Sequence, residues 1–120
     1  MKRRILIVDD ETELATLMAT MIELLGYEAT ALSSPEAALD LLGREKFDLV
    51  ISDFKMPDMS GIELLARSRT AGSLAPPFIL CTGLDNPFEN EALPTGLECI
   101  VKKPFIFADI TKAIHRAIDN

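Results

Sequence analysis

Several short apolar runs of the sequence end in a carboxylate, hydroxyl or ammonium side chain. These side chains are Asp9 and Asp10 after the first run, Asp53 after the third, Thr82 after the fourth and Lys103 after the last. Three carboxylates brought close together repel one another at neutral pH unless a cation lies among them. An all-oxygen ligand set favours a hard ion such as Mg²⁺, which keeps water ligands and leaves positions for a phosphate oxygen. The set is typical of a phosphoryl-transfer site.

The elements that must position these side chains alternate between short apolar runs and helical patterns. Strands are expected at residues 5–8, 27–32, 47–52, 78–81 and 99–101. Helices are expected at 14–25, from Pro35 to about 43–45, from 60 or 61 through 66, and at 106–117. Between 84 and 96, Pro87 and Pro94 leave about six residues for a helix, so a short or irregular fourth helix is predicted there.

Strands that alternate with helices predict a doubly wound α/β fold with a parallel sheet and helices on both faces. For five strands we expect the flavodoxin-like order 2-1-3-4-5, which places the alternating segment 27–32 at an edge. Ligands of such sheets bind beyond the carboxyl ends of the strands, where the strand order reverses. All of the candidate side chains follow strand ends, so they should share that rim.

The acidic start of the first helix decides where a phosphate would lie. A helix N-terminus ordinarily attracts an anion, but the sequence Asp9-Asp10-Glu11 opposes one there. A phosphoryl group should therefore lie nearer Asp53, with the Lys103 ammonium and the Thr82 hydroxyl on its other side.

Composition sets the class of protein. The 120 residues, 48% of them hydrophobic, predict one domain covering 1–120, and the net charge of -7 argues against direct nucleic-acid binding. The first apolar run stops at Asp9, too early for a secretory signal, and no helical pattern is long enough to span a membrane, so a cytoplasmic protein is expected. Cys81 and Cys99 lie in apolar runs without metal-ligand spacing and are expected to be buried thiols.

Four motifs in this order and spacing resemble the receiver domain of two-component response regulators, a chemotaxis-regulator-like fold. They are Val8-Asp9-Asp10-Glu11, Ser52-Asp53-Phe54-Lys55-Met56-Pro57, Thr82-Gly83 and Lys103-Pro104-Phe105. The resemblance covers essentially the whole chain. It implies a signalling module whose only catalysis is its own aspartyl phosphorylation and dephosphorylation.

The resemblance implies a phosphoacceptor and a metal site. Asp53 would accept a phosphoryl group from a histidine kinase or phosphotransfer protein. Asp9, Asp10, Asp53 and the main-chain carbonyl of Lys55 would hold Mg²⁺. The output would be a downstream domain or protein, and a homodimer would use the face of helix 4, strand 5 and helix 5.

The same resemblance implies a conformational switch. Lys103 would pair with the phosphate through a loop whose Lys103-Pro104 bond is cis, Thr82 would move inward to bind it, and Gly83 would leave room and offer a backbone donor. Many receivers carry an aromatic residue three positions before the lysine, where this chain has Ile100. The aromatic half of the switch is therefore missing.

Alternative interpretations stay open at this stage. Asp10 could cap the first helix in a capping box with Glu13, and Asp53 could simply begin a turn. The fold could also serve as a phosphorylation-independent interaction module. A phosphatase of the haloacid-dehalogenase kind is disfavoured because Lys55 replaces the second acid. Lys55 and Leu84 are poorly suited to orienting water, which predicts slow loss of a phosphoryl group.

Overall fold

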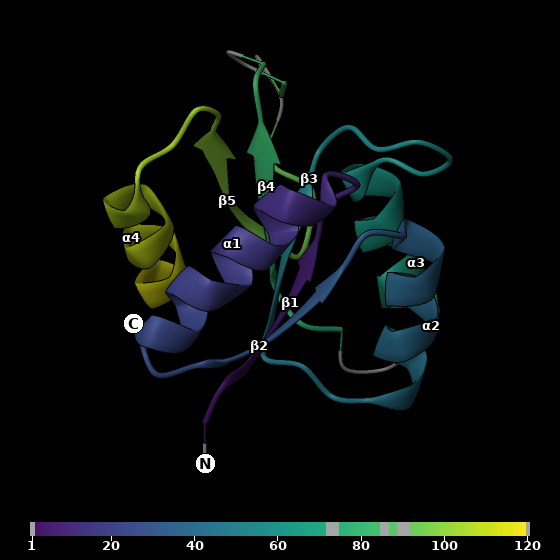
Figure 1. The fold of residues 1–120 in the computed structure, drawn as a ribbon. Helices are drawn as coiled ribbons and strands as arrows, with labels where there is room; N and C mark the ends of the chain where they lie inside the picture. Colours follow the sequence, from purple (N-terminus) through teal and green to yellow (C-terminus); the bar gives the residue numbers. More distant parts are fainter. Residues whose placement is uncertain (1, 72–74, 85–86, 89–91, 120) are drawn as a thin grey trace.

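A five-stranded parallel sheet forms the middle layer of the computed structural model, with helices on both of its faces (Figure 1). The structure describes residues 2–71, 75–84, 87–88 and 92–119. The elements in chain order are β1 (Arg4–Val8), α1 (Thr12–Leu24), β2 (Glu28–Leu32), α2 (Pro35–Arg44), β3 (Leu49–Asp53), α3 (Gly61–Ala71), β4 (Phe78–Thr82), β5 (Leu97–Lys102) and α4 (Phe107–Ile118). None of the described helices is long and apolar enough to cross a bilayer.

The strand order is β2-β1-β3-β4-β5, with every neighbouring pair parallel, which confirms the predicted topology. The central strands β1 and β3 are buried at nearly every position because helices cover both of their faces. At the edge, β2 is only partly buried, as its alternating sequence predicts. The order reverses between β1 and β3, so their carboxyl ends border the predicted crevice.

Two apolar clusters fix the helices to the sheet. In Figure 1, α1 and α4 lie on one face of the sheet and α2 and α3 on the other. Alternate strand residues point to opposite faces, so Ile7 and Ile51 pack with the first helix pair while Leu6 and Val50 pack with the second. Burial of these residues holds the strand ends in register.

The start of α1 differs from one expectation. Glu11 occupies the N-cap position without a side-chain cap, and Asp10 is exposed. The capping interpretation of Asp10 with Glu13 is therefore wrong, and the Asp10 carboxylate is left available. By contrast, α2 begins as predicted, because the Ser34 hydroxyl accepts a hydrogen bond from the Ala37 amide and Pro35 occupies the first turn.

The third strand starts and ends later than the run 47–52 predicts. The amide of Asp48 donates to the Arg4 carbonyl, and the Asp48 carboxylate accepts from the Arg4 amide. Asp48 is therefore bonded to the start of β1 and directly precedes β3. Asp53 is the last residue of β3 and is not a turn residue. The phosphoacceptor candidate is thus held by the sheet itself.

The segment before β5 contains no helix in its described residues 83–84, 87–88 and 92–96, where Pro87 and Phe88 form a turn. The remainder of the short fourth helix predicted between Pro87 and Pro94 lies outside the described residues. The helix after β5 is therefore labelled α4.

Candidate functional site

The site lies at the carboxyl ends of β1, β3, β4 and β5. Asp9 directly follows β1, and its amide donates to the Leu32 carbonyl at 3.1 Å. Its Oδ1 accepts from the Glu11 amide at 2.9 Å. The residue is only 4% exposed. Burying a carboxylate is costly unless it has charged or hydrogen-bonding partners.

Asp53 ends β3 beside Cys81 of β4. The amide that follows it, of Phe54, donates to the Cys81 carbonyl at 2.8 Å, so the sheet ladder extends past the aspartate. Burial raises the pKa of the Cys81 thiol to about 12, which keeps this neighbour of the site neutral. Cys81 is buried and Cys99 half-buried, and both are free thiols.

Three carboxylates converge as predicted. Asp9, Asp10 and Asp53 each offer an oxygen, and these oxygens lie within 4.8 Å of one another. The oxygen-only donor set fits a hard divalent cation that keeps part of its water shell. Asp10 adds an exposed carboxylate to the buried Asp9, so the cluster opens toward solvent.

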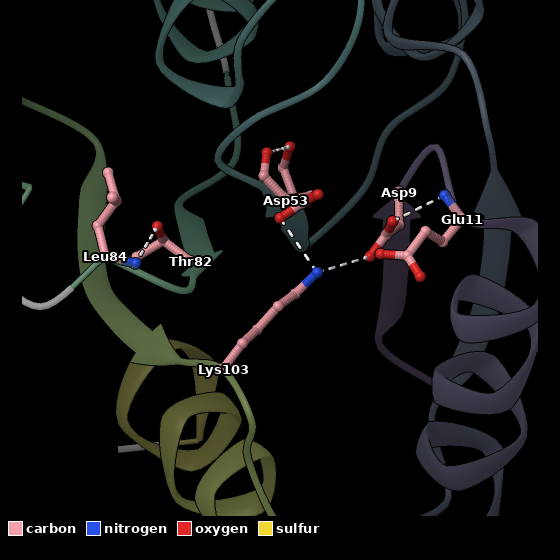
Figure 2. Close-up of polar contacts among 7 residues, drawn as sticks. Asp9, Glu11, Asp53, Thr82, Leu84 and Lys103 are labelled. Atoms are coloured by element: carbon pink, nitrogen blue, oxygen red, sulfur yellow. Dashed lines mark hydrogen bonds and ion pairs between the residues drawn. The ribbon is translucent and has the colours of Figure 1, made fainter.

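Lys103 places an ammonium group between two of these carboxylates, as Figure 2 shows. Its Nζ lies 3.2 Å from Asp53 Oδ1 and 3.4 Å from Asp9 Oδ2. The Lys103 amide donates to the Thr82 carbonyl at 2.7 Å, and the Lys103-Pro104 peptide bond is cis, as expected. From the loop after β5, the Lys103 side chain extends toward Asp53 and Asp9.

Burial and neighbouring charges shift the pKa values of Asp53 and Lys103. Burial raises the pKa of the Asp53 carboxyl, the Lys103 ammonium lowers it, and the charges of Asp9 and Asp10 raise it further, leaving it above its ordinary value. Burial lowers the pKa of Lys103, but Asp53 and Asp9 outweigh that effect and raise it overall. Lys103 therefore stays cationic among the acids at neutral pH.

The candidate switch residues lie beside this pair. Thr82 is 4% exposed, and its hydroxyl accepts a hydrogen bond from the Leu84 amide at 3.1 Å (Figure 2). Gly83 borders open space. Lys55 is exposed in the loop after β3, and Ile100 of β5 is half-buried against the α2 and α3 cluster.

Two contributors near Asp53 were not predicted. The buried Ser52 hydroxyl donates to the Asp53 carbonyl at 2.9 Å. Gly61, predicted only as a helix start, lies against the same carbonyl. The Ser52 bond is made to the next residue of the same strand, and the Gly61 contact joins the main chain of β3 to the first turn of α3.

Comparison with known proteins gives consistent relatives. A family model described as response regulator receiver domain matches residues 5–115. The transcriptional regulatory protein FixJ of Bradyrhizobium diazoefficiens is 32% identical over 117 residues, which cover 98% of this chain and 57% of FixJ. The alkaline phosphatase synthesis transcriptional regulatory protein PhoP of Bacillus subtilis is 34% identical, with 88% of this chain and 44% of PhoP covered. The chain spans about half the length of these two relatives.

Solved structures agree on the fold. The structure titled FixJ-N superposes with a TM-score of 0.86 at 31% identity and covers 98% of this chain and 94% of its own. The chemotaxis protein CheY4 of Vibrio cholerae superposes with a TM-score of 0.87 at 25% identity and covers 98% of this chain and 100% of its own.

Proposed function

The chain belongs to the response regulator receiver domain family, and from this membership we propose that Asp53 accepts a phosphoryl group from a phosphohistidine on a histidine kinase or phosphotransfer protein. The receiver unit would occupy residues 1–120. In the proposed step an Asp53 carboxylate oxygen attacks phosphorus and the phosphorus-nitrogen bond breaks. The imidazole nitrogen keeps the bonding electron pair, and the ring takes a proton from solvent.

The contact between Lys103 Nζ and Asp53 Oδ1, at 3.2 Å, is the observation that carries the proposal. It places a fixed positive charge where negative charge gathers on the transferring group, and such preorganised charge supplies much of phosphoryl-transfer catalysis. Lys103 also pairs with Asp9. If the ammonium shifts toward the phosphate oxygens, Asp9 still keeps its hydrogen bond from the Glu11 amide.

Asp9, Asp10, Asp53 and the Lys55 carbonyl would hold Mg²⁺, which would neutralise phosphate charge when bound. The three carboxylates offer only oxygen and leave room for water, a donor set that Mg²⁺ prefers. The carboxylates themselves would orient the acceptor oxygen of Asp53 and hold the metal cation beside the Lys103 ammonium.

The proposed output is a change in conformation. The Thr82 hydroxyl would leave the Leu84 amide and bind the phosphate, which moves the loop that follows β4. Ile100 has no ring and cannot supply the aromatic movement common in receivers. The Phe54 and Phe88 rings are in contact, with centroids 6.0 Å apart, and this contact joins the loop after Asp53 to the segment after β4. The switch would be read by an output domain or protein, or through a homodimer at the β5 and α4 face.

We propose a cytoplasmic role without direct nucleic-acid contact. The net charge of -7 disfavours a DNA-binding surface on this domain. The matched relatives named as transcriptional regulators are about twice as long as this chain.

The decisive experiment is incubation of the purified protein with a small phosphodonor and Mg²⁺, followed by intact-mass analysis. One phosphoryl group should be added to the wild type and none to Asp53→Asn, with loss of the label in alkali as for an acyl phosphate. An unmodified wild type would remove the proposal. If partner binding then proved the same in Asp53→Ala as in the wild type, the phosphorylation-independent module would replace it.

A further inference from the structure

We propose that Gly61 is a positioning residue for phosphoryl transfer to Asp53, because its lack of a side chain lets α3 begin directly against the main-chain carbonyl of Asp53. The inference rests on the proposed function. It adds an uncharged residue to a site otherwise built from carboxylates, a hydroxyl and an ammonium group.

The space around Gly61 excludes a methyl group. A Cβ at this position would lie 2.5 Å from the Asp53 carbonyl oxygen, 2.8 Å from Leu80 Cδ2 and 3.2 Å from Ser52 Oγ. The Leu80 side chain can shift, whereas Ser52 can rotate only by giving up its bond to the Asp53 carbonyl. The carbonyl is main chain, and a carbon 2.5 Å from it is well inside the normal packing distance.

The Asp53 carbonyl is restrained by hydrogen bonds of its peptide plane. It belongs to the same peptide plane as the Phe54 amide, which donates to the Cys81 carbonyl at 2.8 Å. The Ser52 hydroxyl donates to the carbonyl itself at 2.9 Å. Rotating this peptide plane would break or strain both bonds, so we expect a clash at the carbonyl to be relieved by a shift of the whole Asp53 residue, which moves its carboxylate relative to Lys103.

The start of α3 is also held in place. Gly61 donates its own amide to the Phe54 carbonyl at 2.8 Å. The preceding Ser60 hydroxyl accepts from the Glu63 amide at 3.1 Å, and Leu64 is fully buried in the next turn. Neither the helix nor the strand can retreat freely, so an added methyl group should displace Asp53.

Substitution of Gly61 should therefore slow the reaction and not only weaken the fold. A displacement near 1 Å can cost on the order of 100-fold in rate when reacting groups must be aligned. We expect phosphoryl transfer to Gly61→Ala at least about tenfold slower than to the wild type. Gly61 has no left-handed backbone angle, so the restriction is one of space.

Gly43→Ala is the matched control. Gly43 also lies in a helix with an ordinary backbone angle, but nothing lies within 4 Å of its added Cβ. Both variants are labelled with a small phosphodonor and Mg²⁺ at a temperature where each is fully folded, and rates are expressed per folded molecule. The Phe54 amide resonance is compared in the same proteins without metal or phosphodonor.

Support requires a slow Gly61→Ala with a shifted Phe54 amide and a Gly43→Ala that matches the wild type in both readouts. A Gly61→Ala with the wild-type rate and the wild-type Phe54 resonance would overturn the inference.

If Gly61→Ala does not fold, Ser52→Ala takes its place, since it removes the hydroxyl that donates to the carbonyl. Ser52→Ala should react several-fold more slowly, and an unchanged rate would overturn the inference. A wild type that takes up no phosphoryl group removes the proposed function instead, while the Phe54 resonance still reports whether Gly61 fixes this peptide.

Discussion

Lys103 Nζ lies 3.2 Å from Asp53 Oδ1, and the same ammonium lies 3.4 Å from Asp9 Oδ2. One cation thus serves two of the three converging carboxylates. Burial first, and then the charges of Asp9 and Asp10, keep the pKa of Asp53 raised despite this partner.

Asp53→Asn should raise the stability of the metal-free protein, and the gain should grow as pH rises. A carboxyl whose folded pKa lies above its unfolded value is protonated more readily in the folded state, so its contribution to stability falls as pH rises from the unfolded pKa through the folded one. Asparagine cannot ionise and escapes that loss. Thermal unfolding at pH 4 and pH 7 with a chelator measures the difference. Asp40→Asn, in an exposed pair with Arg44, should change it little, and a less stable Asp53→Asn at pH 7 would contradict the prediction.

Mg²⁺ should stabilise the wild type by mass action. A ligand present at 100 times its Kd adds about 2.7 kcal/mol to the free energy of unfolding. Asp10→Asn removes an exposed carboxylate of the cluster and should abolish most of this gain without unfolding the protein. Glu11→Gln, which changes the next acid along the chain, should keep it. Equal Mg²⁺ responses in both variants would count against Asp10 as a ligand.

Thr82→Ala should separate phosphorylation from its conformational effect. Loss of the bond from the Leu84 amide should cost about 1 kcal/mol of stability, while phosphoryl uptake at Asp53 continues. The chain has no tryptophan, so Phe88→Trp supplies a single tryptophan beside Phe54. Its emission should change on phosphorylation with Thr82 or Thr82→Ser and stay constant with Thr82→Ala. A full response in Thr82→Ala would exclude the proposed switch.

The phosphorylated protein should lose its phosphoryl group slowly. Leu84, 55% exposed two residues beyond Thr82, offers no group to orient an attacking water, and neither does the exposed Lys55 side chain. Leu84→Asn adds an amide at this position and should shorten the lifetime several-fold in an intact-mass time course. Leu24→Asn, 80% exposed on α1, is the matched control and should leave it unchanged. Rapid loss from the wild type would refute this account.

Much of the fold was readable from sequence because the signals are local. Apolar runs such as 5–8 and 78–81 can be buried on both faces only within a covered parallel sheet, and Ser34 with Pro35 specifies a helix start. The capping interpretation of Asp10 failed because a neighbouring carboxylate takes the helix-start amide. Asp9 turns its carboxylate back to the Glu11 amide, so the helix begins beyond Asp10.

The sequence by itself determined which side chains share the rim. Asp9, Asp53, Thr82 and Lys103 lie at strand ends or directly after them, and the ends of parallel strands meet at one edge of the sheet. Only the tertiary structure decided how those groups pair. The bridge from Lys103 to two acids and the close approach of Gly61 to the Asp53 carbonyl depend on loop paths and side-chain angles set by packing between distant segments. Residue order carries no direct signal for contacts of that kind.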